Sequence, residues 1–291
     1  MSNPALSNNP ALNGKTLTAE ELRRIYDQPA AQPDRPGVDG AASSAAAVAA
    51  ATHYGPQQPQ PPVTGSAAPM TYENTISKTV FLFILVVVTA AVGWWMPILM
   101  LPGAIAGLVL GLVNAFKKEP SVPLIIGYAL AQGLFLGGLS GLMEALYPGI
   151  VMQAILGTFS VFGVTLLLFR SGKVRTSPKM TKIFLIAMVG YLVFSLVNVG
   201  IMIFGSGEIA NSAWGLRSGV TVMGIPLGVI IGALAVLLAA YSLVMDFELI
   251  KNGVQNRVPE KWAWSAAFGL MVTLIWLYVE ILRILAILRG N

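Results

Sequence analysis

The residues of this chain that could do chemistry are a few ionisable side chains inside long apolar segments. An ionised group in hydrocarbon costs several kcal/mol unless it is paired or hydrated, so such a residue is a functional candidate by default. With neither thiols nor imidazoles among them, the chemistry on offer is the binding of a cation or a proton by carboxylate oxygens. The candidates are Glu144, Asp246, Glu248, Glu280 and Arg283.

Asp246 is the strongest of these candidates. It follows an unbroken apolar run and precedes the first polar turn, where a cation could reach it from the cytoplasm. Carboxylate oxygens are ligands that calcium prefers, which makes Asp246 a candidate calcium ligand or gate. The alternative is an interface anchor with no site role, and the residues alone leave both interpretations open.

The other candidates have simpler alternatives. Glu280 and Arg283 lie three positions apart, and this spacing predicts an intrahelical ion pair near the membrane interface, as an alternative to a gating role. Glu248 is either a solvated helix end or a secondary ligand. Glu144, near the outer end of its apolar segment, is also a secondary candidate.

Several enzyme classes are excluded by residues that the chain lacks. It has no cysteine, and its one histidine, His53, precedes the apolar part, so thiolate and imidazole chemistry are absent there. Gly138 to Gly141 has the GxSG form of intramembrane serine proteases, but no histidine is available to activate Ser140. A light-driven pump or sensor needs a Schiff-base lysine within a helix, typically the last one, and the last apolar segment has no interior lysine. We therefore expect a protein that is not an enzyme and has no cofactor.

The composition indicates whether these apolar segments lie in water or in a membrane. Hydrophobic residues make up 55% of the 291 and charged residues only 11%, and the mean hydropathy is +0.72. A soluble domain has about a quarter of its residues charged. The sequence therefore predicts an all-α integral membrane protein in contact with the lipid bilayer.

Seven segments have the length needed to cross about 30 Å of hydrocarbon as helices. Trp94 to Pro97 predicts a tight hairpin between the first two, and glycines spaced four apart predict close helix packing. Pro226, placed inside the sixth segment, predicts a kink there. The segments lie near 79–98, 100–116, 122–145, 149–169, 183–204, 221–246 and 262–288.

Basic residues are distributed unequally between the two sides of these segments. Eleven lie on one side, whereas the other side has only Arg217 and Arg289. The positive-inside rule then predicts a multi-pass protein of the cell (cytoplasmic) membrane with its N-terminus in the cytoplasm and its C-terminus outside. The excess charge reflects topology, so we expect no nucleic-acid partner. The eleven are Lys78, Lys117, Lys118, Arg170, Lys173, Arg175, Lys179, Lys182, Lys251, Arg257 and Lys261.

Residues 1–71 differ from the rest of the chain. They carry ten of the eighteen prolines and an Ala/Ser run, a composition that predicts a disordered cytoplasmic tail before a membrane domain at 72–291. Thr18 to Glu21 reads as a capping box that opens a short helix. That helix is either transient or a docking element for a cytoplasmic partner.

Three segments of the apolar part resemble the Bax inhibitor family, the transmembrane Bax inhibitor motif proteins with YccA-like bacterial members. They are Gly-Leu-Phe-Leu-Gly at 133–137, the helix end Tyr-Ser-Leu-Val-Met-Asp-Phe-Glu-Leu-Ile at 241–250, and the last span at 267–288. The resemblance covers about 79–288, and the long tail suggests a bacterial subgroup.

The resemblance implies a seven-helix fold with the last helix at the centre. For some members it also implies a pH-sensitive calcium leak gated by two aspartates. Asp246 matches the first, whereas the register of the last segment places Thr273 where the second would be, and Gln132 occupies a position where many relatives carry an acid. Two carboxylates that share a proton titrate as a coupled pair, which one carboxylate beside a hydroxyl cannot do.

Two functions follow as expectations. The first is a membrane protein that permits or regulates calcium or proton permeation, with pH modulation and with Asp246 as ligand or gate. The second is a non-transporting modulator of a membrane protease or stress-response complex, bound through the tail and helix faces, as some YccA-like members are thought to act.

Overall fold

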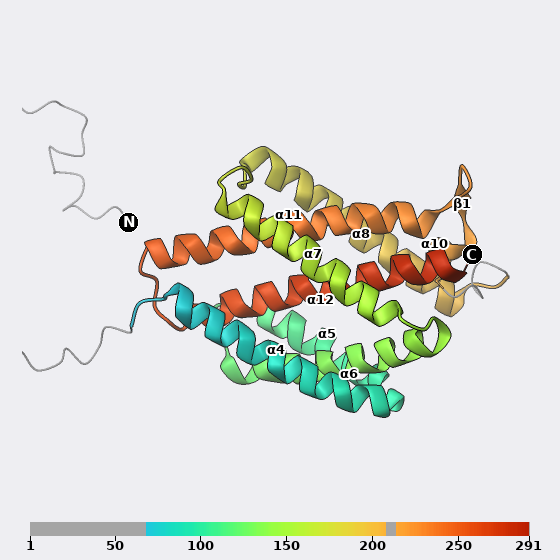
Figure 1. The fold of residues 1–291 in the computed structure, drawn as a ribbon, viewed down its shortest axis with the longest axis horizontal. Coiled ribbons are helices and arrows are strands. Elements are labelled where there is room, and N and C mark those ends of the chain that lie inside the picture. The colour runs from blue at the N-terminus through green and yellow to red at the C-terminus, as the bar shows by residue number, and fades with distance from the viewer. Residues whose placement is uncertain (1–67, 208–213, 291) are drawn as a thin grey trace, which may run out of the picture. The chain divides into compact units, whose positions relative to one another are not determined.

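The computed structural model describes residues 68–207 and 214–290, which form a bundle of helices (Figure 1). The predicted disordered tail up to residue 67, including the helix near Thr18, lies outside the described residues. Within them, seven helices are long and apolar enough to cross a membrane, and the protein is an all-α multi-pass membrane protein, as the sequence predicted. The helices are α4 (Tyr72–Trp95), α5 (Met100–Phe116), α6 (Val122–Leu146), α7 (Ile150–Arg170), α8 (Pro178–Phe204), α11 (Leu227–Gln255) and α12 (Trp262–Gly290).

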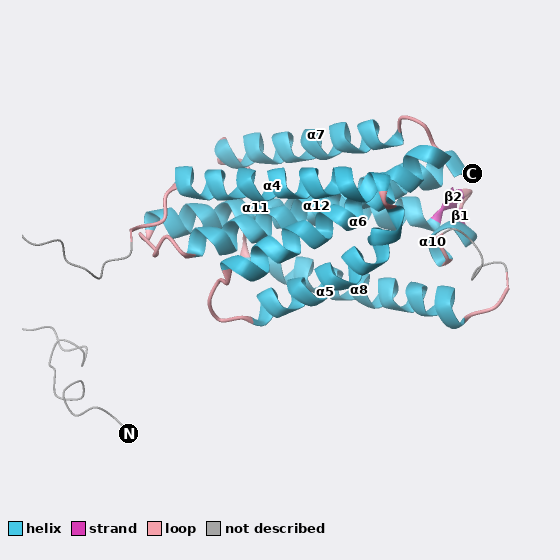
Figure 2. Cartoon of the chain, turned by 90° about the horizontal axis from the view of Figure 1, so that it is seen from below, coloured by secondary structure: helices cyan, strands magenta, loops and turns pink. Residues whose placement is uncertain are grey.

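Short elements join these helices. The hairpin predicted after Trp94 is a 3-10 turn, η2 (Pro97–Leu99), that leads directly into α5. Between α8 and α11 lie the four-residue helix α10 (Leu216–Gly219) and an antiparallel pair of two-residue strands, β1 (Thr221–Val222) and β2 (Ile225–Pro226). Figure 2 shows these strands at one end of the bundle.

Capping residues explain why two helices, α4 and α8, begin before their apolar stretches. Thr71 caps α4, because its hydroxyl accepts a hydrogen bond from the amide of Asn74 at 3.1 Å. Ser177 caps α8 in the same way, and Pro178 occupies the first helical position, where its missing amide donor is not needed. Both helices therefore start five to seven residues before the predicted 183 and 79.

The prediction for the sixth segment was wrong at both ends. Pro226 does not kink a helix: it closes the β1–β2 hairpin and stands immediately before α11, which begins at Leu227. Gly224 also belongs to the hairpin, where it adopts a φ of 80°. At its other end α11 continues to Gln255, so Asp246 lies well inside the helix and not at its end.

Glycines allow α4, α5 and α6 to pack at very short range. A Cβ at Gly137 of α6 would overlap the carbonyl oxygen of Ala90 in α4, and one at Gly103 of α5 would lie 2.8 Å from the carbonyl oxygen of Ala131 in α6. The predicted packing role of Gly103 and its neighbours is therefore confirmed. Ser140, in the GxSG segment, shares a hydrogen bond of 2.7 Å with Tyr278.

The last helix, α12, supplies more buried residues than any other described helix. It has twelve buried residues, and it packs against α4, α6, α7 and α11 (Figure 1). Three clusters of buried residues each include α12 side chains: one with α4 and α6, one with α11, and one with α7. By contrast, α5 packs mainly against α6.

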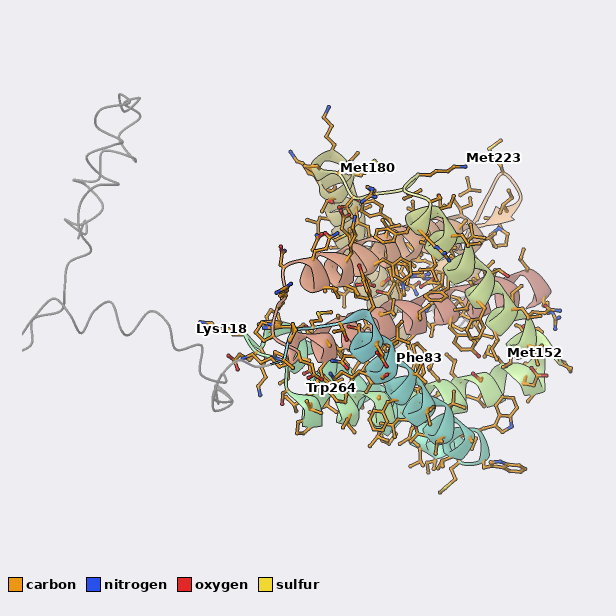
Figure 3. All side chains as sticks on the ribbon, turned by 60° about the vertical axis from the view of Figure 1, so that its left-hand side comes forward. Phe83, Lys118, Met152, Met180, Met223 and Trp264 are labelled. Carbon is orange, nitrogen blue, oxygen red and sulfur yellow. The ribbon has the colours of Figure 1, made fainter. Side chains whose placement is uncertain are left out.

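The two ends of the bundle differ in charge. Lys118 and Met180 lie toward one end and Met152 and Met223 toward the other (Figure 3). The loops and helix ends at the first end carry the eleven basic residues that the sequence groups together, and we call this the basic end. The opposite end, with Trp94 and Arg289, is called the far end.

Candidate functional site

Asp246 lies at the interface of α11 and α12. Its carboxylate accepts a hydrogen bond from the hydroxyl of Thr273 at 2.7 Å, and the Thr273 and Ser242 hydroxyl oxygens are 3.3 Å apart. Thr273 is buried, and on the same helix Gly269 leaves room for the carboxylate, since a Cβ there would lie 3.3 Å from Asp246 Oδ1. Asp246 and Thr273, the two positions that the family resemblance aligned with a pair of gating aspartates, are thus in contact.

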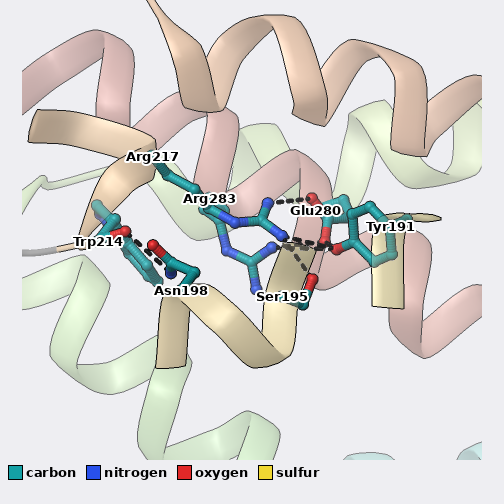
Figure 4. Close-up of polar contacts among 7 residues, drawn as sticks. All are labelled: Tyr191, Ser195, Asn198, Trp214, Arg217, Glu280 and Arg283. Atoms are coloured by element: carbon teal, nitrogen blue, oxygen red, sulfur yellow. Dashed lines mark hydrogen bonds and ion pairs between the residues drawn. The ribbon is translucent and has the colours of Figure 1, made fainter. Parts of the chain in front are cut away.

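Glu280 belongs to a second polar cluster, seven residues further along α12 (Figure 4). Its side chain is 1% exposed and forms an ion pair of 2.5 Å with Arg283, the intrahelical pair that the spacing predicts. A second ion pair of 3.5 Å joins it to Arg217 of α10, which is itself 4% exposed. Glu280 also accepts a hydrogen bond from the hydroxyl of Tyr191 in α8.

Arg217 was not among the sequence candidates. We grouped it with the few basic residues of the outer loops, but in α10 it is buried and contacts α8 and α12. Its guanidinium donates to Tyr191 at 3.2 Å and to Ser195 at 3.1 Å, and it lies over the Phe194 ring. The available signal was its isolation, since a lone arginine next to an apolar segment needs a carboxylate partner.

The cluster around Glu280 borders a cavity of about 430 Å³ between α8, α10 and α12. Two guanidinium groups face one carboxylate there, so its charged side chains sum to one positive charge if all are ionised. Seven residues of helix separate Thr273 from Glu280, a rise of about 10 Å, and the Trp276 and Tyr191 rings lie between the two levels. Glu280 is therefore a partner of arginines and not of Asp246.

The three remaining sequence candidates lie elsewhere, and two of them, Glu144 and Glu248, have hydrogen-bond partners. Glu144 accepts the amides of Gly149 at 2.6 Å and Val151 at 3.1 Å, so it caps the start of α7. Glu248 accepts the amide and the hydroxyl of Thr176 in the α7–α8 loop. Gln132 packs against Gly107 of α5.

A larger apolar groove of about 1050 Å³ runs between α4, α6, α7 and α12. Among its polar groups, Ser140 pairs with Tyr278, and the Thr158 hydroxyl donates to the backbone carbonyl of Ala154. The residues that line the groove are mostly apolar and include no carboxylate, so it offers a surface to hydrocarbon and no charged ligand to a cation.

Comparison with known families assigns the chain. A family model described as Bax inhibitor 1 like matches residues 3–290. The chain belongs to the Bax inhibitor 1-like family. A search of curated protein sequences finds no significant match. The family resemblance that the apolar segments suggested is therefore confirmed, and the match to this family includes most of the N-terminal segment as well.

The oxygen atoms around Asp246 are few for a bound metal ion. Within residues 68–207 and 214–290, no three His, Cys, Asp or Glu side chains gather to hold a metal. Calcium takes six to eight oxygen ligands, whereas Asp246, Thr273 and Ser242 provide four side-chain oxygens at most. This arrangement suits brief contact with a partly hydrated cation, or with a proton, better than a resident metal.

Proposed function

We propose that this Bax inhibitor 1-like protein permits or regulates the permeation of a cation, calcium or a proton, across the cytoplasmic membrane, without enzymatic activity. The observation that carries the proposal is the Asp246 carboxylate in the α11–α12 interface, which is bound by the hydroxyl of Thr273. A carboxylate between two membrane helices, with a neutral neighbour and no cationic partner among the described side chains, is expensive unless it serves an ion or a proton.

The positive-inside rule supports a cytoplasmic basic end, with the N-terminus inside and the C-terminus outside. In this orientation Asp246 lies in the cytoplasmic half of the bundle, and the cluster of Glu280, Arg283 and Arg217 lies in the outer half. An ion that crossed between α8, α11 and α12 would meet the arginines first from outside. Their positive charge would slow cations and make the leak small.

Flux from liposomes tests the proposal. Purified protein in vesicles loaded with a calcium or pH indicator is expected to release the ion faster than empty vesicles, and Asp246→Asn is expected to lower the rate at least tenfold. The matched control is Glu248→Gln, which removes a carboxylate two residues away that is bound to Thr176. Release at the empty-vesicle level for both ions, together with co-purification of a membrane protease, would favour the non-transporting modulator instead.

A further inference from the structure

A short strap from the end of the N-terminal segment lies across the α11–α12 loop. The amide of Met70 donates to the carbonyl of Val258 at 2.7 Å, and the amide of Glu260 donates to the carbonyl of Ala68 at 2.7 Å. These two hydrogen bonds flank a single antiparallel bridge between Pro69 and Pro259. The composition placed Ala68 to Met70 in the tail, but in the structure they pair with the helical domain.

The Met70 side chain fills a socket at the basic end. It is only 3% exposed and packs with Ala263 and Ala266 of α12, with Ile250 and Val254 of α11 beside them. Gly253 forms the floor, where a Cβ would lie 2.8 Å from the Met70 sulfur, so a larger residue there would make the Met70 side chain shift. Small residues on both helices thus leave a space that this one side chain occupies.

The socket lies on the same helix interface as Asp246. Gly253 follows Asp246 by seven residues, two turns of α11 on the same face, which places the socket about 10 Å closer to the basic end. On α12, Ala266 lies one turn before Gly269, which borders the Asp246 carboxylate.

The loop that the strap crosses is tied to α4. Lys78 forms an ion pair of 2.6 Å with Glu260, the residue whose amide binds Ala68, and its ammonium lies 5.7 Å from the centre of the Trp264 ring. Among the described residues, the strap Ala68 to Met70 itself is held by two backbone hydrogen bonds and by the packing of the Met70 side chain. A segment with so few contacts opens locally without unfolding the bundle.

We propose that Met70 is a plug that closes the basic-end mouth of the α11–α12 interface, and that displacement of the Ala68–Met70 strap admits water to Asp246. The chain itself links this plug to the N-terminal tail, so a cytoplasmic partner that pulls on the tail would act on the Asp246 site. The importance of the plug rests on the proposed permeation, but the access of water to this interface is measurable without any ion flux.

The absence of natural cysteines makes the test direct. Ala266→Cys places the only thiol of the chain beneath Met70, and its reaction with a charged, water-soluble methanethiosulfonate is followed in detergent or liposomes. Met70→Ala in this background is expected to raise the reaction rate at least tenfold. Met180→Ala, which shortens an exposed methionine at the same end, is the matched control and leaves the rate unchanged.

Two truncations separate the plug from the rest of the tail. A chain that begins at Ala68 keeps the strap and is expected to protect the introduced thiol as the full chain does, whereas a chain that begins at Thr71 exposes it. Asn256→Cys, on the exposed loop, reports that the reagent is equally active in every sample. If Met70→Ala does not fold, Met70→Val, which shortens the side chain less, replaces it and is expected to give a smaller increase.

Equal protection of the Ala266→Cys thiol in folded samples with and without Met70 would overturn the plug. Faster labelling without any ion flux would keep the plug and refute permeation. Ion flux that depends on Asp246, with no change in labelling, would keep permeation and refute the plug. The two proposals therefore fail separately.

Discussion

Two carboxylates inside the helix bundle have opposite surroundings. Asp246 is bound by a neutral hydroxyl of Thr273, whereas Glu280 is bound by Arg283 and Arg217. The first can change its charge or accept an ion without breaking an ion pair. The second neutralises arginines that could not otherwise lie in hydrocarbon.

Thr273→Asp is expected to increase calcium leak. The new carboxylate would stand within hydrogen-bond distance of Asp246, adding a hard oxygen ligand and a second negative charge. Two carboxylates this close share a proton, so the leak should also depend more strongly on pH, and it should be larger at about pH 8 than at about pH 6. Vesicle flux measured across this range checks it, and Asp246→Asn in the same background should remove the gain. An unchanged leak in a folded variant would contradict the pairing.

Glu280→Gln is expected to destabilise the bundle strongly. The change leaves Arg217 and Arg283 without their carboxylate, and the loss of one partner of a buried ion pair costs about 3–5 kcal/mol. Thermal unfolding in detergent measures the effect as a lower midpoint. Glu119→Gln is the control, because its ion pair with Lys261 is exposed and should matter little. Equal midpoints for the two variants would argue that the Glu280 cluster is not structural.

At the scale of elements, two different means hold the helices together. α4 and α6 touch through glycines at backbone distance, whereas α8 buries only Phe184 and Asn198 along its length. Polar contacts attach α8 instead: Asn198 accepts the amide of Leu216 at 2.7 Å, and Thr181 pairs with Tyr241 at 3.0 Å. In a membrane, where lipid competes for apolar surfaces, such contacts fix the position of a helix.

Gly137→Ala is expected to lower the unfolding midpoint markedly, although alanine favours a helix by about 1 kcal/mol. The added methyl group would overlap the Ala90 carbonyl oxygen and force α4 away from α6. Gly163→Ala on α7 has the same gain in helix propensity but meets nothing within 4 Å, so this variant should keep or raise the midpoint. Thermal unfolding of both, side by side, is the measurement. A stable Gly137→Ala would show that α4 and α6 are not packed this closely.

Hydrophobic length and turn chemistry predicted the existence and order of all seven helices, but their ends depended on polar details. The caps at Thr71 and Ser177 were readable from sequence and were overlooked. Gly224 and Pro226 were the local signals for a hairpin before Leu227, but Val222 and Ile225 suit an apolar helix equally well, and Pro226 was interpreted as a kink. The Glu280 cluster was only partly predictable, because Arg217 and Glu280 lie far apart in the sequence and meet through the packing of α10 against α8 and α11, which no residue spacing encodes.

At the scale of the molecule, the charge asymmetry between the two ends predicts its orientation. Reporter proteins fused after Asn291 should be active only outside, and reporters inserted after Lys173 only in the cytoplasm. A third reporter, inserted after Asn256 in the α11–α12 loop, should also be active only in the cytoplasm. The loop is preferred to Gly253, because Gly253 lies inside α11 and contacts Met70. A cytoplasmic reporter at Asn291 would contradict this orientation.

The central position of α12 has a consequence for biosynthesis. Among the seven helices it leaves the ribosome last, yet its side chains complete three of the buried clusters. The six helices made before it must therefore enter the membrane around a site that is still vacant, with Arg217 waiting for Glu280. Insertion of α12 is then the step that closes the core, and a helix that carries Glu280 and Arg283 together enters hydrocarbon with its charges already paired.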